Sequence, residues 1–546
     1  MAASPPADRR RADGRRAADG GRRCEELVIT DVQEWLRETA GHTFMSVTRL
    51  PLEELAGWYE DPETGDIRHR SGRFFTIEGL DVRRPGWAVP AWTQPIINQP
   101  ETGILGILLK RVGGVPHLLM QAKNEPGNID GPQLSPTVQA TRSNYTGVHG
   151  GRPVPYLDLF REPRGRVLAD VRQSEQGAWF YRKRNRNMVV EVGEEVAAAE
   201  GFRWLPLRRV RDLLSVPDLV NMDVRTVLAC LPARDGRADG GSGGGLGDRF
   251  GDGLAGGSGG GSGGGFGALL ERSRDPGAGA AHGTPEILSW LSGVRSTVDV
   301  QVRPLPLNRL RGWHRSGGRI SHESGGFFDV VGVRVEAHGR EVGRWTQPMI
   351  EPVGTGLVAF LVRPVRGVLH ALVHARAEPG CTDVVELAPT VQCAPGDYDH
   401  LPARARPVLL DQVLETVRAL PGRVRFDTVL SEEGGRFYHA RNRYLVVETD
   451  EDPLPGHPSF RWLALHQLDG LLRHSYYLNV QARTLIACLH GLTGTTGTTG
   501  TTTASTTVAA SRAGTTVAAG TAGTTGTAAT AVAVGAHRRP VTGGVR

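Results

Sequence analysis

Apolar residues along the chain gather mostly in short runs of the length of a β-strand. The runs cover residues 103–110, 116–122, 187–192, 356–362, 368–375 and 444–448. Such runs, bounded by polar and turn-forming residues, are typical of strands. A helical spacing of apolar residues occurs at 31–38, 207–214 and 221–231. The pattern predicts an α+β fold in which mixed sheets are flanked by a few helices.

The two halves of the chain carry the same short motifs in the same order. WTQP at 92–95 recurs at 345–348, EPG at 125–127 recurs at 378–380, PTVQ at 136–139 recurs at 389–392, and RNR at 184–186 recurs at 441–443. The offset between copies grows only from 253 to 258 residues along the chain. Small changes of offset indicate short loop insertions in one duplicated fold.

Three segments lack the apolar content that a folded core needs. They are an Arg/Ala/Gly arm at the start, a central Gly/Ser-rich run and a Thr/Gly/Ala tail. The predicted organisation is a disordered arm (1–23), a first repeat (24–231), a flexible Gly/Ser-rich linker (232–282), a second repeat (283–492) and a disordered tail (493–546).

The formal net charge of +6 belongs to the ends of the chain. Residues 1–23 and 493–546 each carry +4, which leaves about −2 for the body between them. A nucleic-acid groove built on general basicity is therefore not expected. No run of 18 apolar residues predicts a membrane span. Five cysteines without a CxxC pair argue against a Cys-rich zinc site and favour a cytoplasmic chain with free thiols.

Lysine is nearly absent from the chain. Of 64 cationic residues only Lys110, Lys123 and Lys183 are lysines. An ammonium group gives up a proton more readily than a guanidinium group, so each retained lysine is a candidate for chemistry. Lys123 lies in QAKNEPGN at the end of a predicted strand. Loops at strand ends are where sites are usually built.

A second polar patch covers residues 173–187 and includes Arg184, Asn185 and Arg186. Guanidinium groups bind phosphate oxygens in pairs, so this patch suits a phosphate or diphosphate. The alternative interpretation is a solvated, charged strand.

Five motifs resemble the NDP-hexose 2,3-dehydratase family of deoxysugar biosynthesis, here expected to serve antibiotic biosynthesis. They are WTQPI (92–96), QAKNEPGN (121–128), QLSPTVQATRSNYT (133–146), SEQGAWFYRKRNRN (174–187) and LVNMDVRTVL (219–228). The resemblance covers about residues 24–492 and implies two tandem Nudix-like repeats, a homodimer and neither metal nor redox cofactor. The Gly-rich insert and the long tail depart from the family pattern.

The resemblance also implies a substrate, dTDP-4-keto-6-deoxy-D-glucose, and a partner, an NAD(P)H-dependent 3-ketoreductase that consumes the product. A C4 ketone acidifies the C3 proton, so an enolate forms and the C2 hydroxyl leaves, giving a 3,4-diketo-2,6-dideoxyhexose. The reaction needs a base, a partner for the C4 oxyanion and a proton source. The catalytic candidates are Lys123, Tyr145, His149 and Glu175. Which of them acts as acid and which as base stays open, because environment tunes each group.

A larger set of residues is expected to bind the substrate. Trp92 and Trp345 could stack on the thymine ring, although a Trp at such a position more often belongs to the core. The candidates are Trp92, Gln94, Gln133, Ser135, Thr137, Gln139, Asn144, Arg184, Asn185, Arg186, Trp345, Gln347, Arg441 and Arg443.

The differences between the copies predict which repeat is catalytic. Arg376 stands where the first repeat has Lys123, and Tyr145 and His149 have no aligned counterparts. We therefore expect a catalytic first repeat and an auxiliary nucleotide site in the second. Glu125 and Glu175 recur in the second copy, which favours a structural role for the first of them and a binding role for the other.

Two other functions are considered. A Nudix diphosphate hydrolase needs a magnesium-binding signature, and its nearest match at 190–195 lacks the required Arg and the upstream Gly and Glu. A GxGxxG dinucleotide motif after a strand is also missing. A non-catalytic nucleotide-sugar binding protein remains as the main alternative.

Overall fold

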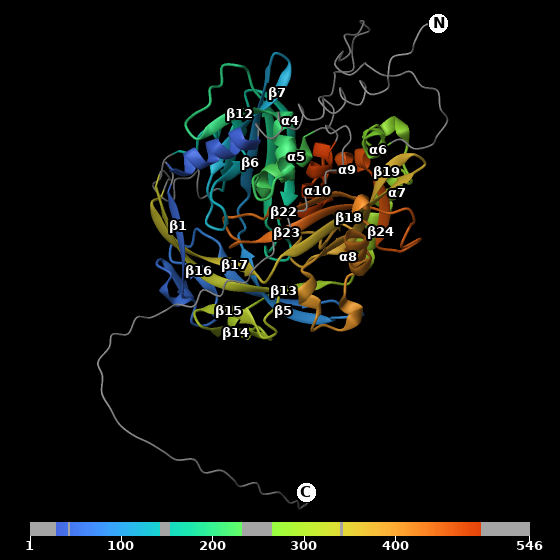
Figure 1. The fold of residues 1–546 in the computed structure, drawn as a ribbon. Helices are drawn as coiled ribbons and strands as arrows, with labels where there is room; N and C mark the ends of the chain where they lie inside the picture. The colour runs from blue at the N-terminus through green and yellow to red at the C-terminus, as the bar shows by residue number, and fades with distance from the viewer. Residues whose placement is uncertain (1–28, 42–43, 142–152, 232–264, 339–341, 493–546) are drawn as a thin grey trace, which may run out of the picture. The chain divides into compact units, whose positions relative to one another are not determined.

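The structure, a computed structural model, describes residues 29–41, 44–141, 153–231, 265–338 and 342–492. These residues lie within one compact unit. The order of their strands and helices repeats along the chain, so that each half builds a large sheet and most of a small one (Figure 1).

The large sheet of the first repeat has seven strands, in the order β10-β11-β6-β7-β12, with β8 paired to β7 and β9 paired to β6. Strands β6 and β11 are parallel and the other pairs are antiparallel, so the sheet is mixed. The bounds are β6 (Gly103–Val112), β7 (Val115–Lys123), β8 (Gln133–Ser135), β9 (Val138–Ala140), β10 (Arg166–Ser174), β11 (Arg184–Glu191) and β12 (Phe202–Pro206).

The second repeat builds the same sheet, in the order β20-β19-β18-β23-β22, with β21 paired to β18 and β24 to β19. All six strands predicted from apolar runs are confirmed, as β6, β7, β11, β18, β19 and β23. The bounds are β18 (Gly356–Val365), β19 (Val368–Ala377), β20 (Val385–Ala388), β21 (Val391–Cys393), β22 (Val424–Ser431), β23 (Arg441–Glu448) and β24 (Phe460–Ala464).

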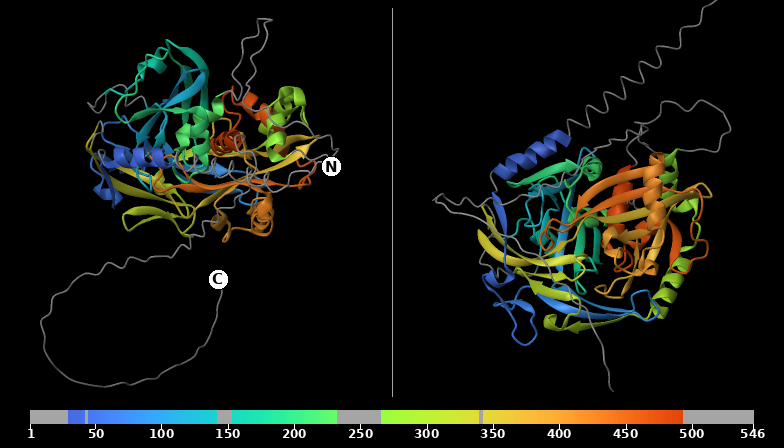
Figure 2. Two further views of the ribbon diagram at one scale, coloured as in Figure 1. Left: turned by 45° about the horizontal axis from the view of Figure 1, so that its top comes forward. Right: turned by 60° about the horizontal axis from the view of Figure 1, so that its bottom comes forward.

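The two small sheets exchange one strand between the repeats. Strand β1 (Met45–Leu50) pairs along its whole length with β16 of the second repeat, and β13 (Gln301–Leu305) pairs with β4 of the first (Figures 1 and 2). The other strands are β2 (Trp58–Glu60), β3 (Ile67–His69), β4 (Thr76–Arg83), β5 (Ala91–Asn98), β14 (Trp313–Ser316), β15 (Arg319–His322), β16 (Phe328–Ala337) and β17 (Arg344–Pro352).

Glycine permits this exchange. A Cβ atom on Gly79 would lie 2.6 Å from the carbonyl oxygen of Leu305, and one on Gly332 would lie 2.6 Å from that of Leu50. Both glycines stand opposite the end of the strand that the other repeat contributes. A side chain at either position would hold the exchanged strand away from the sheet.

Most of the helices form one core together with the large sheets, and the two over 158–161 and 410–419 pack in smaller apolar clusters. The predicted helix at 31–38 is confirmed as a helix over residues 29–41. The others are α3 (Asp158–Arg161), α4 (Leu207–Asp212), α5 (Met222–Cys230), α6 (Phe266–Ser273), α7 (Thr284–Thr297), α8 (Leu410–Ala419), α9 (Leu465–Leu471) and α10 (Val480–Gly491). Short 3-10 turns are η1 (Leu52–Glu54), η2 (Leu213–Ser215), η3 (Pro276–Ala278), η4 (Leu307–Arg309), η5 (Pro395–Tyr398), η6 (Ala403–Ala405) and η7 (Pro421–Arg423).

Helices α5 and α10 lie side by side at the centre of this core (Figure 1). Asn221 and Asn479 cap their first turns, each accepting a backbone N–H at 3.0 Å. Such a cap satisfies one of the free N–H groups at a helix start.

Two fully buried arginines on these helices bind across to the opposite repeat. Arg483 on α10 donates to the carbonyl oxygen of Ser174 at 2.6 Å and to the hydroxyl of Thr226 at 2.6 Å. Arg225 on α5 donates in the same way to the carbonyl oxygen of Ser431. Because a buried guanidinium group is costly unless it is hydrogen-bonded, these contacts hold the repeats together.

Helix α6 corrects the predicted linker of residues 232–282 at its C-terminal end. Residues 266–273 are helical, and Leu270 is buried in the core beside β19. The compositional bias of the Gly/Ser run hides this short apolar stretch. The prediction also treats each repeat as a self-contained unit and does not include the strand exchange.

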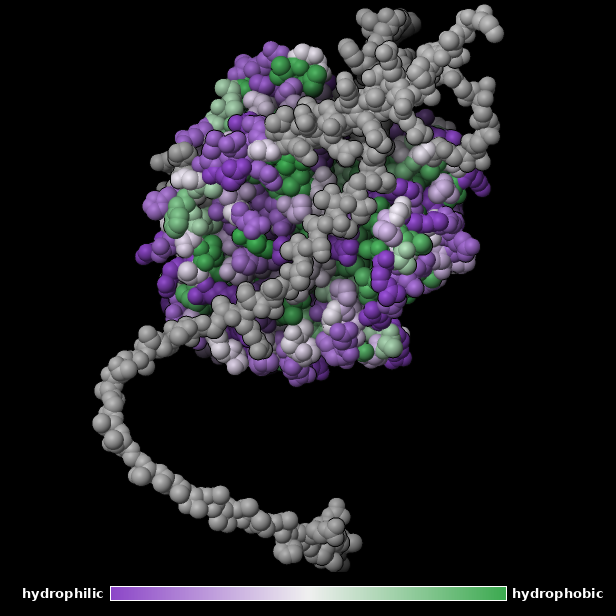
Figure 3. Space-filling model, in the orientation of Figure 1, coloured by the Kyte–Doolittle hydropathy of each residue, from purple (hydrophilic) through white to green (hydrophobic). Residues whose placement is uncertain are grey.

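In the described part of the chain, no helix has both the length and the apolar character needed to cross a membrane. On the face drawn in Figure 3, apolar residues lie in small groups among polar ones.

We predict that Arg483→Met destabilises the fold by about 3–5 kcal/mol, because the carbonyl oxygens of Ser174 and Leu478 and the hydroxyl of Thr226 lose the hydrogen bonds that Arg483 donates. Unfolding in urea measures the change. Arg344→Met, which breaks an exposed pair with Glu336, is the control and is expected to cost less than about 1 kcal/mol. Equal costs for the two variants would contradict the role given to Arg483.

Candidate active site

The first repeat builds a polar cluster where β7 ends. Lys123 Nζ donates to Oε1 of Gln139 at 2.7 Å and lies 3.4 Å from Oε1 of Glu125. Gln139 on β9 in turn donates to the same Glu125 oxygen at 2.9 Å. The Lys123 side chain keeps 18% exposure whereas Glu125 keeps 7%. The ammonium group is therefore held by buried partners and remains partly accessible.

The second repeat has the same arrangement around an arginine. Arg376 Nε donates to Oε1 of Glu378 at 3.1 Å, and Gln392 donates to that oxygen at 2.8 Å. The shared glutamate anchors a cation in both copies, in line with the structural role expected for Glu125. The copies differ in the cation itself.

Three other predicted binding residues of the first repeat make buried internal contacts. Thr137 donates to the carbonyl oxygen of Leu119 at 2.6 Å, inside the sheet. Ser135 accepts from Asn221 at 2.8 Å, which docks the start of α5 on β8. Gln133 reaches the second repeat and donates to the hydroxyl of Ser431 at 2.9 Å. Their described contacts are those of a scaffold.

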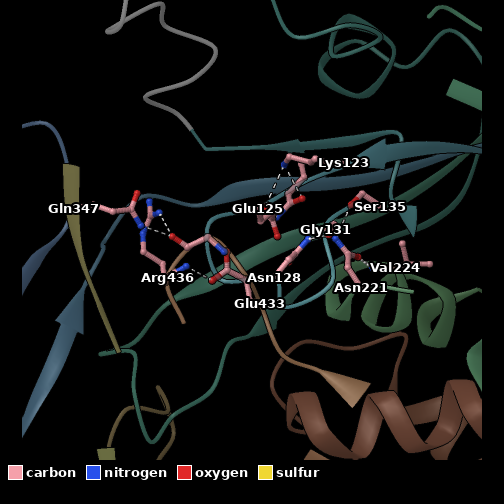
Figure 4. Close-up of polar contacts among 12 residues, drawn as sticks. Lys123, Glu125, Asn128, Gly131, Ser135, Asn221, Val224, Gln347, Glu433 and Arg436 are labelled. Carbon is pink, nitrogen blue, oxygen red and sulfur yellow. Dashed lines mark hydrogen bonds and ion pairs between the residues drawn. The ribbon is translucent and has the colours of Figure 1, made fainter. Parts of the chain in front are cut away.

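A loop of the second repeat completes the cluster. The N–H of Gly127 donates to the carbonyl oxygen of Gly434 at 2.7 Å. A Cβ atom on Gly434 would lie 2.9 Å from Cβ of Glu125, so only glycine fits there. Figure 4 shows Glu433 and Arg436 of this loop in the same close-up as Lys123 and Glu125. The site region is therefore built by both repeats.

Equivalent glutamates in the two repeats have different hydrogen bonds. Glu432 accepts from Asn442, Tyr444 and Gln176 at 2.7, 2.7 and 2.8 Å. Glu175 accepts from Asn185 at 2.8 Å, and its Oε2 is buried without a partner among the described residues. A buried carboxylate oxygen without a donor favours binding of a proton.

The electrostatics around Glu175 raise carboxyl pKa values. Burial raises the pKa of Glu175, against Arg483, Lys183 and the bond from Asn185. The pKa of Asp223 on α5 is raised well above its usual value, first by burial and then by Glu175 and other acids. Burial lowers the pKa of Lys183 to about 8, and its ammonium donates to the carbonyl oxygen of Glu101. Within the described ranges, no three His, Cys, Asp or Glu side chains are arranged to hold a metal ion.

The two Trp-Thr-Gln motifs hold loops in place. Trp92 Nε1 donates to Gln94, which donates to the carbonyl oxygen of Ala178 at 2.7 Å. Trp345 and Gln347 make the equivalent contacts to Gly435. These side chains position the loops that follow β10 and β22.

The Arg-Asn-Arg motifs split into paired and less engaged residues. Arg186 makes a bidentate ion pair with Asp170, and Arg443 makes one with Asp427. Asn185 bridges Glu175 and the N–H of Gly103. Arg441 contacts Asp218 of the first repeat at 3.3 Å, and Arg184 is half-buried at the start of β11. Three of the four arginines are thus paired with a carboxylate.

Three predicted residues, Asn144, Tyr145 and His149, lie outside the described residues. Conversely, Asp223, Gln176, Glu433 and Arg436 belong to the site region but were missed from the sequence. A position-by-position comparison of the two copies could have found them, because each differs from its equivalent in the other copy. The equivalent pairs are Asp223 and Gln481, Gln176 and Glu433, and Trp179 and Arg436.

Carboxyl, ammonium and amide groups close together at the end of a strand are typical of an enzyme that uses general acid–base catalysis. The family model described as NDP-hexose 2,3-dehydratase matches residues 29–231 and 284–489. The chain belongs to this family, whose reaction is that of a hydro-lyase, and the domain is present twice.

Three relatives are each named dTDP-4-dehydro-6-deoxy-alpha-D-glucopyranose 2,3-dehydratase. The protein from Saccharopolyspora spinosa is 46% identical over 86% of this chain and 93% of its own length. The one from Streptomyces violaceoruber is 48% identical over 85% and 98%, and the one from Amycolatopsis orientalis 44% over 85% and 91%.

We predict unequal losses of stability when the two equivalent charges are removed. Glu432→Gln places an amide group against existing donors and should cost about 2–3 kcal/mol. Glu175→Gln removes an oxygen that has no donor and should cost less than about 1 kcal/mol. Thermal and urea unfolding of both variants measure this. A larger cost for Glu175→Gln would contradict the assigned hydrogen bonds.

Proposed function

We propose that the chain eliminates water across C2 and C3 of dTDP-4-keto-6-deoxy-D-glucose at a site in the first repeat. The observation that carries the proposal is the Lys123 cluster, in which a partly exposed ammonium group replaces the arginine of the second repeat. The names of the three relatives support the choice of substrate.

In the proposed mechanism, Lys123 stabilises the oxyanion that forms at C4. Glu175 takes the C3 proton, since burial raises the pKa of its carboxyl group above the usual value. The C2 hydroxyl then leaves as water, with a proton from Tyr145 or His149, and the enol tautomerises to the 3,4-diketo-2,6-dideoxyhexose. A preorganised cation at a developing oxyanion is commonly the largest contribution to such a reaction.

Further proposals follow from the family resemblance. They are a Nudix-like fold for each repeat, a homodimer and consumption of the product by an NAD(P)H-dependent 3-ketoreductase. The mixed seven-stranded sheet with a helix against it supports the first of these. A flexible linker between the repeats is proposed from the Gly/Ser composition alone.

The turnover test couples the chain to such a reductase and follows the 2-deoxy sugar. We expect Lys123→Met to lower kcat by about 10²–10³-fold, because the oxyanion loses its cation. Lys110→Met is the matched control, since Lys110 lies over the Trp204 ring at 4.4 Å, away from the cluster, and should retain kcat. Binding of dTDP without any turnover would favour the non-catalytic alternative.

We further propose that the second repeat binds a nucleotide without catalysis. Arg84, from the loop after β4, has a pKa lowered to about 9 by burial and by Arg376, and its Nε is buried without a partner in the described chain. Two guanidinium groups close enough for one to lower the pKa of the other attract an anion such as a diphosphate. His374 beside them stacks on Phe460, with ring centres 4.3 Å apart.

Calorimetric titration with dTDP tests this second site. Wild-type chain should bind two equivalents, and Arg84→Met with Arg376→Met should bind one. Arg303→Met, an exposed arginine on β13, should retain both sites. Two equivalents in the double variant would refute an anion site between Arg84 and Arg376.

A further inference from the structure

Gln176 and Glu433 occupy equivalent positions in the two repeats, each following the glutamate at the end of its strand. Gln176 reaches across and donates from Nε2 to Oε2 of Glu432 at 2.8 Å. A side chain of this length at this position can therefore hydrogen-bond the glutamate of the opposite repeat.

On the other side of this pseudo-twofold arrangement, the donor is missing. Glu433 accepts the N–H groups of Gly435 and Arg436, both at 2.9 Å, and is an acceptor only while it is ionised. The Oε2 atom of Glu175 is the buried oxygen that has no partner in the described chain. One interface thus pairs a carboxylate with an amide, whereas the residue equivalent to that amide in the other repeat, Glu433, carries a second carboxyl group.

We propose that Glu433, when protonated, gives Glu175 the hydrogen bond that Gln176 gives Glu432, so that the two glutamates hold one proton between them. The proposal rests on the proposed function, because it makes Glu433 a positioning residue that the second repeat supplies to the first-repeat site. A protonated carboxyl group has both a donor and an acceptor, so Glu433 can keep one loop N–H while it donates to Glu175.

The surroundings favour a single negative charge on this pair. Burial raises the pKa of Glu433 to about 7, with further increases from Glu125 and Glu175 and decreases from Arg436 and the N–H of Gly435. Two carboxylates that share a site ionise one after the other and titrate as a pair.

Charges of both signs face the pair from every neighbouring element. The negative groups are Glu125 after β7, Asp223 on α5 and Glu432 at the end of β22. The positive groups are Lys183 before β11, Arg436 on the same loop and Arg483 on α10. Cations near the pair already supply positive charge. What the shared proton adds is a hydrogen-bond donor, which an ionised carboxylate cannot provide.

The reaction itself conserves this proton. The C3–H bond breaks and its proton passes to Glu175, while the C2–O bond breaks and the departing hydroxide takes up one proton to become water. The enzyme as a whole gains one proton and releases one, so the pair returns to its starting state once the proton on Glu175 passes to the acid that protonated the leaving hydroxide. Glu433 acts by keeping Glu175 ionised and oriented, without touching the sugar.

The first test uses substrate-free protein. In infrared difference spectra between pH 5 and 8, Glu433→Gln should lack one protonated carboxyl group that wild type loses through about pH 7. Glu451→Gln, an exposed glutamate, is the matched control and should retain that group. An unchanged carboxyl signal in Glu433→Gln would overturn the shared proton.

The pH dependence of stability is a second test for the shared proton. The pKa of Glu433 is raised on folding, so its contribution to stability is present below its usual value of 4.5 and is lost as pH rises through about 7. The Tm of wild type should therefore fall between pH 5 and 7.5 relative to that of Glu433→Gln. Parallel curves would overturn the proposal.

The pH profile of kcat tests the positioning role. In wild type kcat should fall as pH rises through about 7, and in Glu433→Gln this fall should move up by about one unit or more, because the amide stays a donor. The Glu433→Ala variant should have a low kcat at every pH, because alanine offers no hydrogen-bond donor to Glu175. The Glu433→Gln variant keeps a donor and should retain kcat. An equal loss for both variants at all pH values would indicate a purely structural residue and overturn the role.

The outcomes separate this inference from the proposed function. A shared proton together with an unaffected Lys123→Met variant would refute the first-repeat site alone. A slow Lys123→Met variant together with an unchanged carboxyl signal in Glu433→Gln would refute the shared proton alone.

Discussion

Each of the two buried arginines needs hydrogen-bond acceptors that its own repeat does not fully provide. Arg225 and Arg483 find them in the carbonyl groups at the ends of β22 and β10, across the interface. An unbonded guanidinium group in the core would cost several kcal/mol, so the two strand ends are fixed opposite each other. The loops that carry Glu175 and Glu433 start at those carbonyls, and their mutual placement follows from this one exchange.

The symmetric frame makes the differences between the repeats informative. Backbone contacts are reciprocal, since Gly127 binds Gly434 and Gly380 binds Gly177, both at 2.7 Å. Side chains break the symmetry at these sites, as where Lys123 of the first repeat is replaced by Arg376 at the equivalent position of the second. Because the backbone contacts around these glycines match on both sides, we attribute the chemical difference between the sites to a few substituted side chains.

The sequence predicts the strands of the large sheets because they depend on local pattern, and it singles out Lys123 at the end of one of them. A buried strand such as 103–110 is apolar whichever neighbour it has, and Lys123 and Glu125 are close along the chain. The strand exchange could not be predicted, since residues 45–50 have the same alternation whether they pair with their own repeat or the other. Glu433 was missed because only tertiary packing brings it to Glu125, and its own repeat gave no reason to associate it with the first.

The exchanged strands β1 and β13 have the form of a swapped dimer contained in one chain. In an assembly of two identical chains, symmetry would force every residue to occur on both sides of the axis. A glutamine on one side and a glutamic acid at the equivalent position on the other side could then not occur together. Joining the copies in tandem removes this restriction, so a single substitution can specialise one half of the interface while the other half keeps the original contact.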